Sequence, residues 1–148
     1  MAQGDPAGQY QAGMRLTATY CAELERFHMQ PLNAAGRTYE VERRAYHAAR
    51  PGFRIAEIQI APTQTIPWHY HTETQDTFYV IEGMIRIFTR EPEEEVCLTV
   101  GMTYSVRPGR PHLVVNDGDT SAVFLVLQGM GEHDFVALAP DVEDPWRT

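Results

Sequence analysis

The stretch Pro67-Trp68-His69-Tyr70-His71, followed by Asp76 and by the turn Glu82-Gly83, decides how this chain can fold and what it can bind. Side chains two positions apart on an extended strand project from the same face. His69 and His71 could therefore bind one ion together. A single histidine is more often a surface residue than a ligand, but two unpartnered imidazoles on one buried face would be costly.

A second segment further along the chain matches the first. It begins at Gly101, turns at 107–111 (Arg-Pro-Gly-Arg-Pro) and continues through His112 to Asn116. We predict that His112 joins the two earlier histidines and a carboxylate from Asp76 around one divalent metal ion, inside a small β-barrel. We expect Asn116 to cap a turn rather than to touch the ion.

Length and charge limit the remaining possibilities. The chain has 148 residues and a net charge of −8, which fits one soluble domain and argues against nucleic acid or an anionic membrane as a partner. No apolar run approaches the roughly 20 residues that a membrane span needs, and no signal peptide is evident, so we expect a cytoplasmic protein. Cys21 and Cys97 are expected to be reduced thiols, Cys97 buried on a strand between Val96 and Leu98.

Short β-rich runs separated by turn residues dominate the chain after Pro51-Gly52. We expect strands over 53–60, 77–81, 84–88, 96–100, 102–106, 112–116, 121–128 and 135–138. The runs 77–81 and 84–88, joined at Glu82-Gly83, form the best candidate for a β-hairpin. Such a series of short strands favours a closed or sandwiched antiparallel barrel.

The first fifty residues are less regular. Residues 1–13 are expected to be a flexible tail, and 14–148 a single domain whose motif-bearing core covers about 53–128. The segment 17–27 is ambiguous between strand and helix, and 37–48 is expected to hold a strand followed by a short helical turn.

These spacings resemble the two motifs of the cupins, G-x5-H-x-H-x(3,4)-E-x6-G and G-x5-P-x-G-x2-H-x3-N. The positions that match them are His69, His71, Gly83, Gly101, Gly109, His112 and Asn116. The resemblance implies an all-β fold, the antiparallel double-stranded β-helix or jelly-roll barrel, with an N-terminal extension that carries an extra strand or a short helix. It also implies a homodimer.

Three positions depart from the motifs. Thr63 replaces the leading glycine of the first motif, and Arg107 replaces the proline of the second. Asp76 replaces the glutamate and is one methylene shorter. Gln75 satisfies the shorter variant of the spacing and could substitute for Asp76. Because neighbouring strand residues face opposite ways, only one of the two should point inward, and we favour Asp76.

Three neutral imidazoles and one carboxylate suit Fe, Mn, Ni, Cu or Zn as a divalent ion, one per chain. We expect a metal-dependent enzyme acting on a small oxygen-rich organic molecule, of the dioxygenase, isomerase or lyase type. The alternative is a non-catalytic small-ligand-binding module whose metal is structural or docks the ligand. No catalytic acid or base beyond the metal can be named from the sequence.

Further residues are weaker candidates. Those that could line a substrate pocket are Tyr79, Arg86, Tyr104 and Trp68, although core packing or solvent exposure would explain each of them as well. The remaining histidines, His28, His47 and His133, have no partner at a ligand-like spacing and are expected to be surface or hydrogen-bonded residues.

Overall fold

The computed structural model describes residues 39–138. The tail 1–13, the ambiguous segment 17–27, Cys21 and His28 lie outside the described residues. Within 39–138 every regular element is a β-strand. No helix in this part of the chain is long and apolar enough to cross a membrane.

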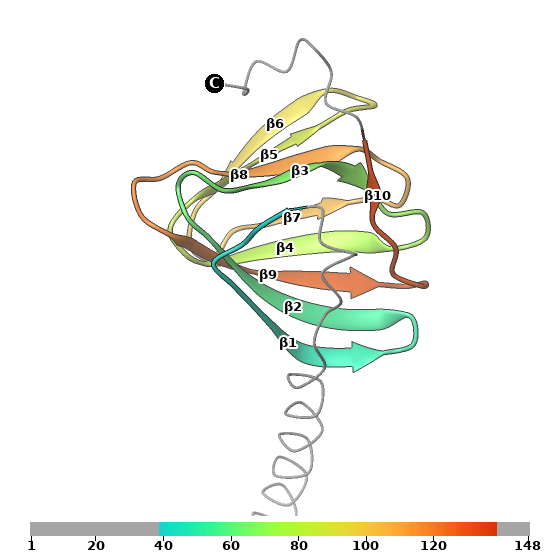
Figure 1. Ribbon diagram of the computed structural model, residues 1–148. Coiled ribbons are helices and arrows are strands. Elements are labelled where there is room, and N and C mark those ends of the chain that lie inside the picture. Colours follow the sequence, from blue (N-terminus) through green and yellow to red (C-terminus); the bar gives the residue numbers. More distant parts are fainter. Residues whose placement is uncertain (1–38, 139–148) are drawn as a thin grey trace, which may run out of the picture. The chain divides into compact units, whose positions relative to one another are not determined.

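Ten strands form two antiparallel sheets that face each other (Figure 1). Their bounds are β1 Arg43–Arg50, β2 Phe53–Ile60, β3 Thr65–Tyr70, β4 Gln75–Glu82, β5 Ile85–Thr89, β6 Glu94–Leu98, β7 Thr103–Val106, β8 His112–Asn116, β9 Ala122–Gly129 and β10 Val136–Ala137. The first sheet has the order β1-β2-β9-β4-β7, and the second has the order β10-β3-β8-β5-β6. The all-β expectation is confirmed.

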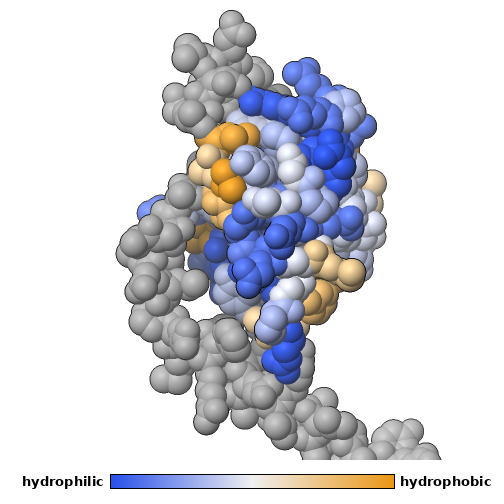
Figure 2. Space-filling view, turned by 90° about the vertical axis from the view of Figure 1, so that its right-hand side faces the viewer, coloured by the Kyte–Doolittle hydropathy of each residue, from blue (hydrophilic) through white to orange (hydrophobic). Residues whose placement is uncertain are grey.

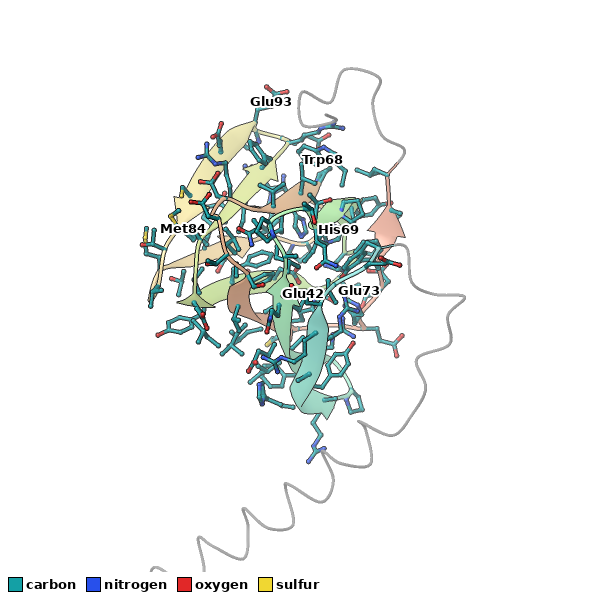
Figure 3. The ribbon with its side chains drawn as sticks, turned by 60° about the vertical axis from the view of Figure 1, so that its left-hand side comes forward. Glu42, Trp68, His69, Glu73, Met84 and Glu93 are labelled. Carbon is teal, nitrogen blue, oxygen red and sulfur yellow. The ribbon has the colours of Figure 1, made fainter. Side chains whose placement is uncertain are left out.

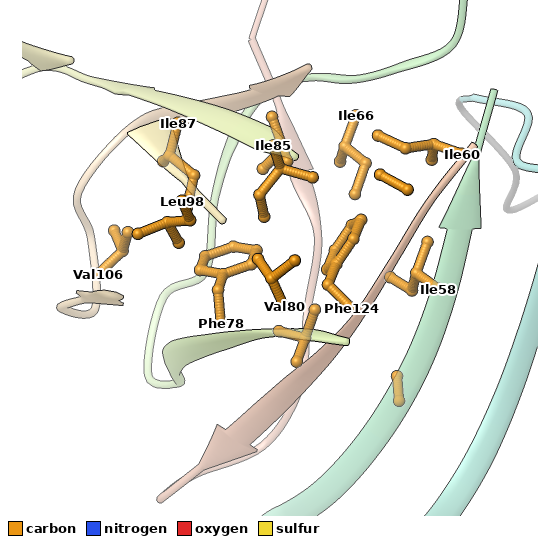
Figure 4. Packing of buried hydrophobic residues seen from close by; sticks show 14 residues of the cluster. Ile58, Ile60, Ile66, Phe78, Val80, Ile85, Ile87, Leu98, Val106 and Phe124 are labelled. Carbon is orange, nitrogen blue, oxygen red and sulfur yellow. The ribbon is translucent and has the colours of Figure 1, made fainter. Parts of the chain in front are cut away.

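The core lies between the sheets because every second residue of a strand points inward. In β2 the inward residues Ala56, Ile58 and Ile60 are buried, while most of the outward residues are half-buried. Figure 4 shows how such side chains from both sheets interdigitate, with the rings of Phe78 and Phe124 near the centre. This apolar packing supports the layer of polar residues described below.

The expected hairpin of 77–81 with 84–88 is wrong. β4 pairs with β7 and β9 in the first sheet, whereas β5 pairs with β6 and β8 in the second. The Glu82-Gly83 turn therefore carries the chain from one sheet to the other. Gly83 has φ of +74°, and a Cβ there would lie 2.9 Å from the carbonyl oxygen of Ser121. Glycine is needed at this corner because the backbone of the β8–β9 connection packs directly against it.

Two local expectations are also corrected. The helical turn expected within 37–48 is absent from its described part, where β1 instead runs to Arg50 and pairs with β2 along its length. This strand is the extra strand of the N-terminal extension. Cys97 is exposed rather than buried, because Leu98 is the neighbour that points into the core, which turns the cysteine outward.

The strand register aligns polar residues into rows at one end of the barrel. Across the first sheet, Arg54 of β2 lies opposite Gln128 of β9, which lies opposite Asp76 of β4. Across the second sheet, His69 of β3 lies opposite His112 of β8. Directly opposed residues share a face, so both rows point into the space between the sheets.

Candidate metal centre

Four buried side chains meet at this end of the barrel. His69, His71, Asp76 and His112 each offer a ligand atom, and these atoms all lie within 4.8 Å of one another. Their exposed fractions are only 1–3%. Figure 3 shows His69 on the inner side of β3, between the two sheets. The structure thus brings together the four residues that the sequence analysis assigned to one site.

The three imidazoles are oriented in the same way. The Nδ1 atom of His69 is 2.7 Å from the carbonyl oxygen of Pro67, and that of His112 is 3.0 Å from the carbonyl oxygen of Arg110. The Nδ1 atom of His71 bonds the carbonyl oxygen of Asp134. A carbonyl can only accept, so each Nδ1 carries the proton. Each Nε2 is therefore the nitrogen available to an ion, which is how ligand histidines are normally held.

The ligand spacing fits a shared ion. The Oδ2 atom of Asp76 lies 3.0 Å from Nε2 of His71 and 3.3 Å from Nε2 of His112. Ligand atoms at about 2.0–2.2 Å from one ion and at right angles to each other are about 3 Å apart. The shorter aspartate therefore reaches far enough. Gln75 does not compete with it, because its side chain is exposed and its amide donates to the hydroxyl of Thr77.

The charges of the group also suit a cation. Burial lowers the pKa of His69 to about 2, so this imidazole is neutral. Burial opposes ionisation of Asp76, but the contacts of its carboxylate with His112 and His71 lower its pKa below the usual range and keep it anionic. Burial likewise opposes protonation of His71, yet the hydrogen bond to Asp76 raises its pKa. Without metal, His71 and Asp76 therefore form an ion pair whose proton a metal ion would displace.

Two residues that the sequence analysis did not assign to the site complete the row on the first sheet. Gln128 is buried, and its Nε2 donates to Oδ1 of Asp76 at 2.8 Å. Its Oε1 accepts from Nε of Arg54. Since arginine is only a donor, this contact fixes the amide with its nitrogen toward Asp76. One oxygen of the carboxylate is thereby occupied, and Oδ2 is left facing the histidines. A glutamine ending the apolar run 121–128 was the signal available in the sequence.

The closing segment, residues 130–138, crosses the same end of the barrel from β9 to β10 (Figure 1). The ring of Phe135 stacks on His69, with centroids 4.2 Å apart and an interplanar angle of 14°. Thr72 binds the carboxylate of Asp134 through its amide at 2.8 Å and its hydroxyl at 2.5 Å. The segment thus covers the histidines and helps to keep water from them. The outer surface at this end is mainly hydrophilic (Figure 2).

His133, expected to be a surface or hydrogen-bonded residue, lies beside the site. Its ring centroid is 5.0 Å from that of His71, and its Nε2 accepts from Nη2 of Arg54 at 2.5 Å. His133 is exposed and hydrogen-bonded, as expected, but partial desolvation and the neighbouring charge of Arg54 lower its pKa to about 3. It is therefore a neutral acceptor. His47, by contrast, pairs with Glu57 at the surface.

The four pocket candidates do not surround the histidines. Tyr79 is 40% exposed on the outer face of the first sheet, and Arg86 pairs with Glu95 and Asp117 on the outer face of the second. Trp68 packs with Phe88 and Leu113 on the far side of β3 from His69 (Figure 3).

The fourth candidate, Tyr104, is on the inner face, but its hydroxyl bonds Glu94 at 2.7 Å and accepts from Arg110 at 3.2 Å. Asn116 caps the β8–β9 turn as expected. Its Nδ2 donates to the carbonyl of Thr120, and its Oδ1 accepts from the amide of Gly118, both at 2.8 Å.

Comparison with known proteins supports the same fold. Residues 56–128 match the family model described as a cupin domain. A double-stranded beta-helix protein from Klebsiella pneumoniae is 23% identical with a TM-score of 0.59, over 74% of this chain and 90% of that one. No curated protein matches the chain.

Two enzymes share the fold, each over a smaller part of its own chain. An oxalate oxidase is 22% identical with a TM-score of 0.55, over 59% of this chain and 46% of its own. An oxalate decarboxylase is 20% identical with a TM-score of 0.62, over 76% of this chain and 31% of its own. The chain thus spans less than half the length of either enzyme, and at these identities the likeness concerns the fold. The family match, the double-stranded β-helix and the buried His-His-Asp-His group together show that the chain belongs to the cupin superfamily.

Proposed function

We propose that this chain is a metal-dependent enzyme that acts on a small oxygen-rich organic molecule, with the ion held by His69, His71, Asp76 and His112. The observation that carries the proposal is the common orientation of the three imidazoles. Each Nδ1 donates to a backbone carbonyl, and this leaves the three Nε2 atoms free beside a carboxylate oxygen, with the four ligand atoms within 4.8 Å of one another. A histidine cluster that served packing alone would not need all three rings turned the same way.

The donor set suits the divalent ions Fe, Mn, Ni, Cu and Zn, with one ion per chain. Such an ion can polarise a carbonyl group, stabilise an enolate or activate oxygen, which are the chemistries of isomerases, lyases and dioxygenases. The chain's own residues would shape the surroundings. Phe135 would exclude water from the histidines, and Gln128 would hold the carboxylate of Asp76 in place.

Elemental analysis of protein purified without added metal tests the site. We expect about one transition-metal ion per wild-type chain and a large loss in His69→Ala and His112→Ala. If both variants fold and keep stoichiometric metal, the proposed site is wrong. His47→Ala is the matched control. His47 pairs with Glu57 at the surface, so this variant should keep the wild-type metal content.

Turnover is a separate question. The metal-loaded protein should be screened for oxygen consumption and product formation with diketones, catechols, thiols and small carboxylic acids, including the oxalate that names two of the structural neighbours. Conversion of one class supports the enzyme. Binding of a small molecule without conversion would instead favour the alternative, a ligand-binding module.

We further propose a homodimer formed through the outer face of the first sheet. Tyr79 is 40% exposed there, and the half-buried side chains of Ile55, Leu125 and Leu127 lie on the neighbouring strands of the same face. A second copy would cover this apolar surface. Light scattering after size-exclusion chromatography should show a dimer for the wild type and a shift toward monomer for Tyr79→Arg.

A further inference from the structure

Two arginines lie on the inner face of the first sheet, Arg54 on β2 and Arg44 on β1. Arg54 is in the row with Gln128 and Asp76, and Arg44 lies opposite the inward-facing Ile58. Both side chains are half-buried. Burial lowers the pKa of Arg54, and the nearby charge of Arg44 contributes to the same shift. A guanidinium nevertheless stays charged, so two positive charges face the interior here.

Neither arginine has a carboxylate within ion-pair distance among residues 39–138. Arg54 donates to the neutral groups of Gln128 and His133. Arg44 donates from Nη2 to the hydroxyl of Tyr39 at 2.5 Å, and its buried Nε has no hydrogen-bond partner. Charged side chains that are partly withdrawn from water are usually paired, because an uncompensated charge costs free energy there. Among residues 39–138 these two guanidiniums have no carboxylate in direct contact.

A bound metal ion would add to this imbalance. The carboxylates of Asp76 and of Asp134, beside His71, carry one negative charge each, whereas the two guanidiniums and a divalent ion would supply four positive ones. An uncharged ligand would leave that excess in place. The whole chain carries a net charge of −8, so the positive charge at the site is a local feature.

The chemistry of the guanidinium favours a small planar anion. Cζ of Arg54 lies over the ring of Tyr46, 5.3 Å from its centroid. A planar carboxylate matches the planar guanidinium fork.

We propose that Arg54, supported by Arg44, binds the carboxylate of a small organic acid whose other oxygen-bearing end reaches the metal site. The carboxylate replaces His133 as the acceptor for Nη2 of Arg54, exchanging a neutral acceptor for a charged one. This inference rests on the proposed function and narrows its substrate class to carboxylic acids.

The test compares two probes of nearly equal shape, glycolate and glycolamide, which differ by one negative charge. Each is titrated calorimetrically into the full chain loaded with Mn(II), after elemental analysis has measured the metal content. We expect the wild type to bind glycolate at least about tenfold more tightly than glycolamide, as a charge-assisted hydrogen bond would give. Arg54→Gln should abolish that preference, and Arg54→Lys should keep part of it.

Arg43→Gln is the matched control, because Arg43 is on the same strand pair but its guanidinium pairs with Glu57 at the surface. It should retain the full preference. Equal binding of the two probes by the metal-loaded wild type, or binding of neither, overturns the inference while the metal site stands. A full glycolate preference in metal-loaded Arg54→Gln overturns it as well. Wild type that takes up no metal refutes the proposed function and with it the inference.

If Arg54→Gln fails to fold or to take up metal, the wild-type comparison and Arg54→Lys still decide the question. The lysine variant keeps the charge and can still donate to Gln128.

Discussion

Replacing Gln128 with leucine is the most direct test of the polar row Arg54-Gln128-Asp76 across the first sheet. Gln128→Leu removes both contacts of the amide, so that Oδ1 of Asp76 and Nε of Arg54 each lose a partner. Each buried group left without a partner costs about 1–3 kcal/mol, and the buried leucine returns about 1.5–3 kcal/mol through its apolar surface. The net loss in the free energy of unfolding is about 1–3 kcal/mol, or on the order of 3–10 °C in Tm for a chain of this length.

The same substitution should weaken metal binding about 10–100-fold, the usual effect of removing a group that orients a ligand. Chemical denaturation of the metal-free protein measures the first effect, and titration calorimetry with Mn(II) measures the second. Gln59→Leu is the control, because Gln59 bonds Glu42 at an exposed position of the same sheet. It should change stability by less than about 0.5 kcal/mol. If the two variants are equally stable and bind metal equally well, the row does not position Asp76.

Three further outcomes follow from the geometry. Asp76→Asn removes the charge but keeps the shape, and elemental analysis should show at least half of the bound metal lost; full retention would exclude Asp76 as a ligand. Metal affinity should rise by about tenfold per pH unit between about pH 5 and 6.5, because the proton held on His71 by its raised pKa competes with the ion; a flat calorimetric profile would contradict this. Gly83→Ala should destabilise the protein more than Gly109→Ala in denaturant. Both glycines have φ of +74°, but only at Gly83 would the new Cβ meet backbone, the Ser121 oxygen at 2.9 Å; equal losses would refute that reason.

The strand pattern of this chain was readable from the sequence, but the pairing of the strands was not. The run His112–Asn116 is a strand with the expected limits, because turn residues flank it on both sides. The prediction of a hairpin at Glu82-Gly83 was wrong because a tight turn with glycine fits two geometries. It can return the chain within one sheet, or it can carry the chain from one sheet to another. Only long-range pairing, such as β4 with β9, distinguishes them.

The metal-ligand candidates could be identified from the sequence because their spacing along the chain is fixed. The residues that support them could not be identified in this way. Gln128 and Arg54 reach Asp76 through the register of three strands that are far apart in sequence. A shift of one residue in any of them would turn these side chains outward. The expectation that His133 is a surface or hydrogen-bonded residue holds, but its position beside the site could not be predicted, since it lies on an irregular segment whose path across the barrel follows no periodic pattern.

The proposed ligands come from both layers of the barrel. Asp76 belongs to the first sheet, and His69 and His112 belong to the second. Each sheet has its own backbone hydrogen bonds. An ion bound by ligands from both sheets would therefore cross-link them. Loading the ion should accordingly slow amide exchange most in β3, β4 and β8 at that rim, while the opposite rim, near Gly83, exchanges as before.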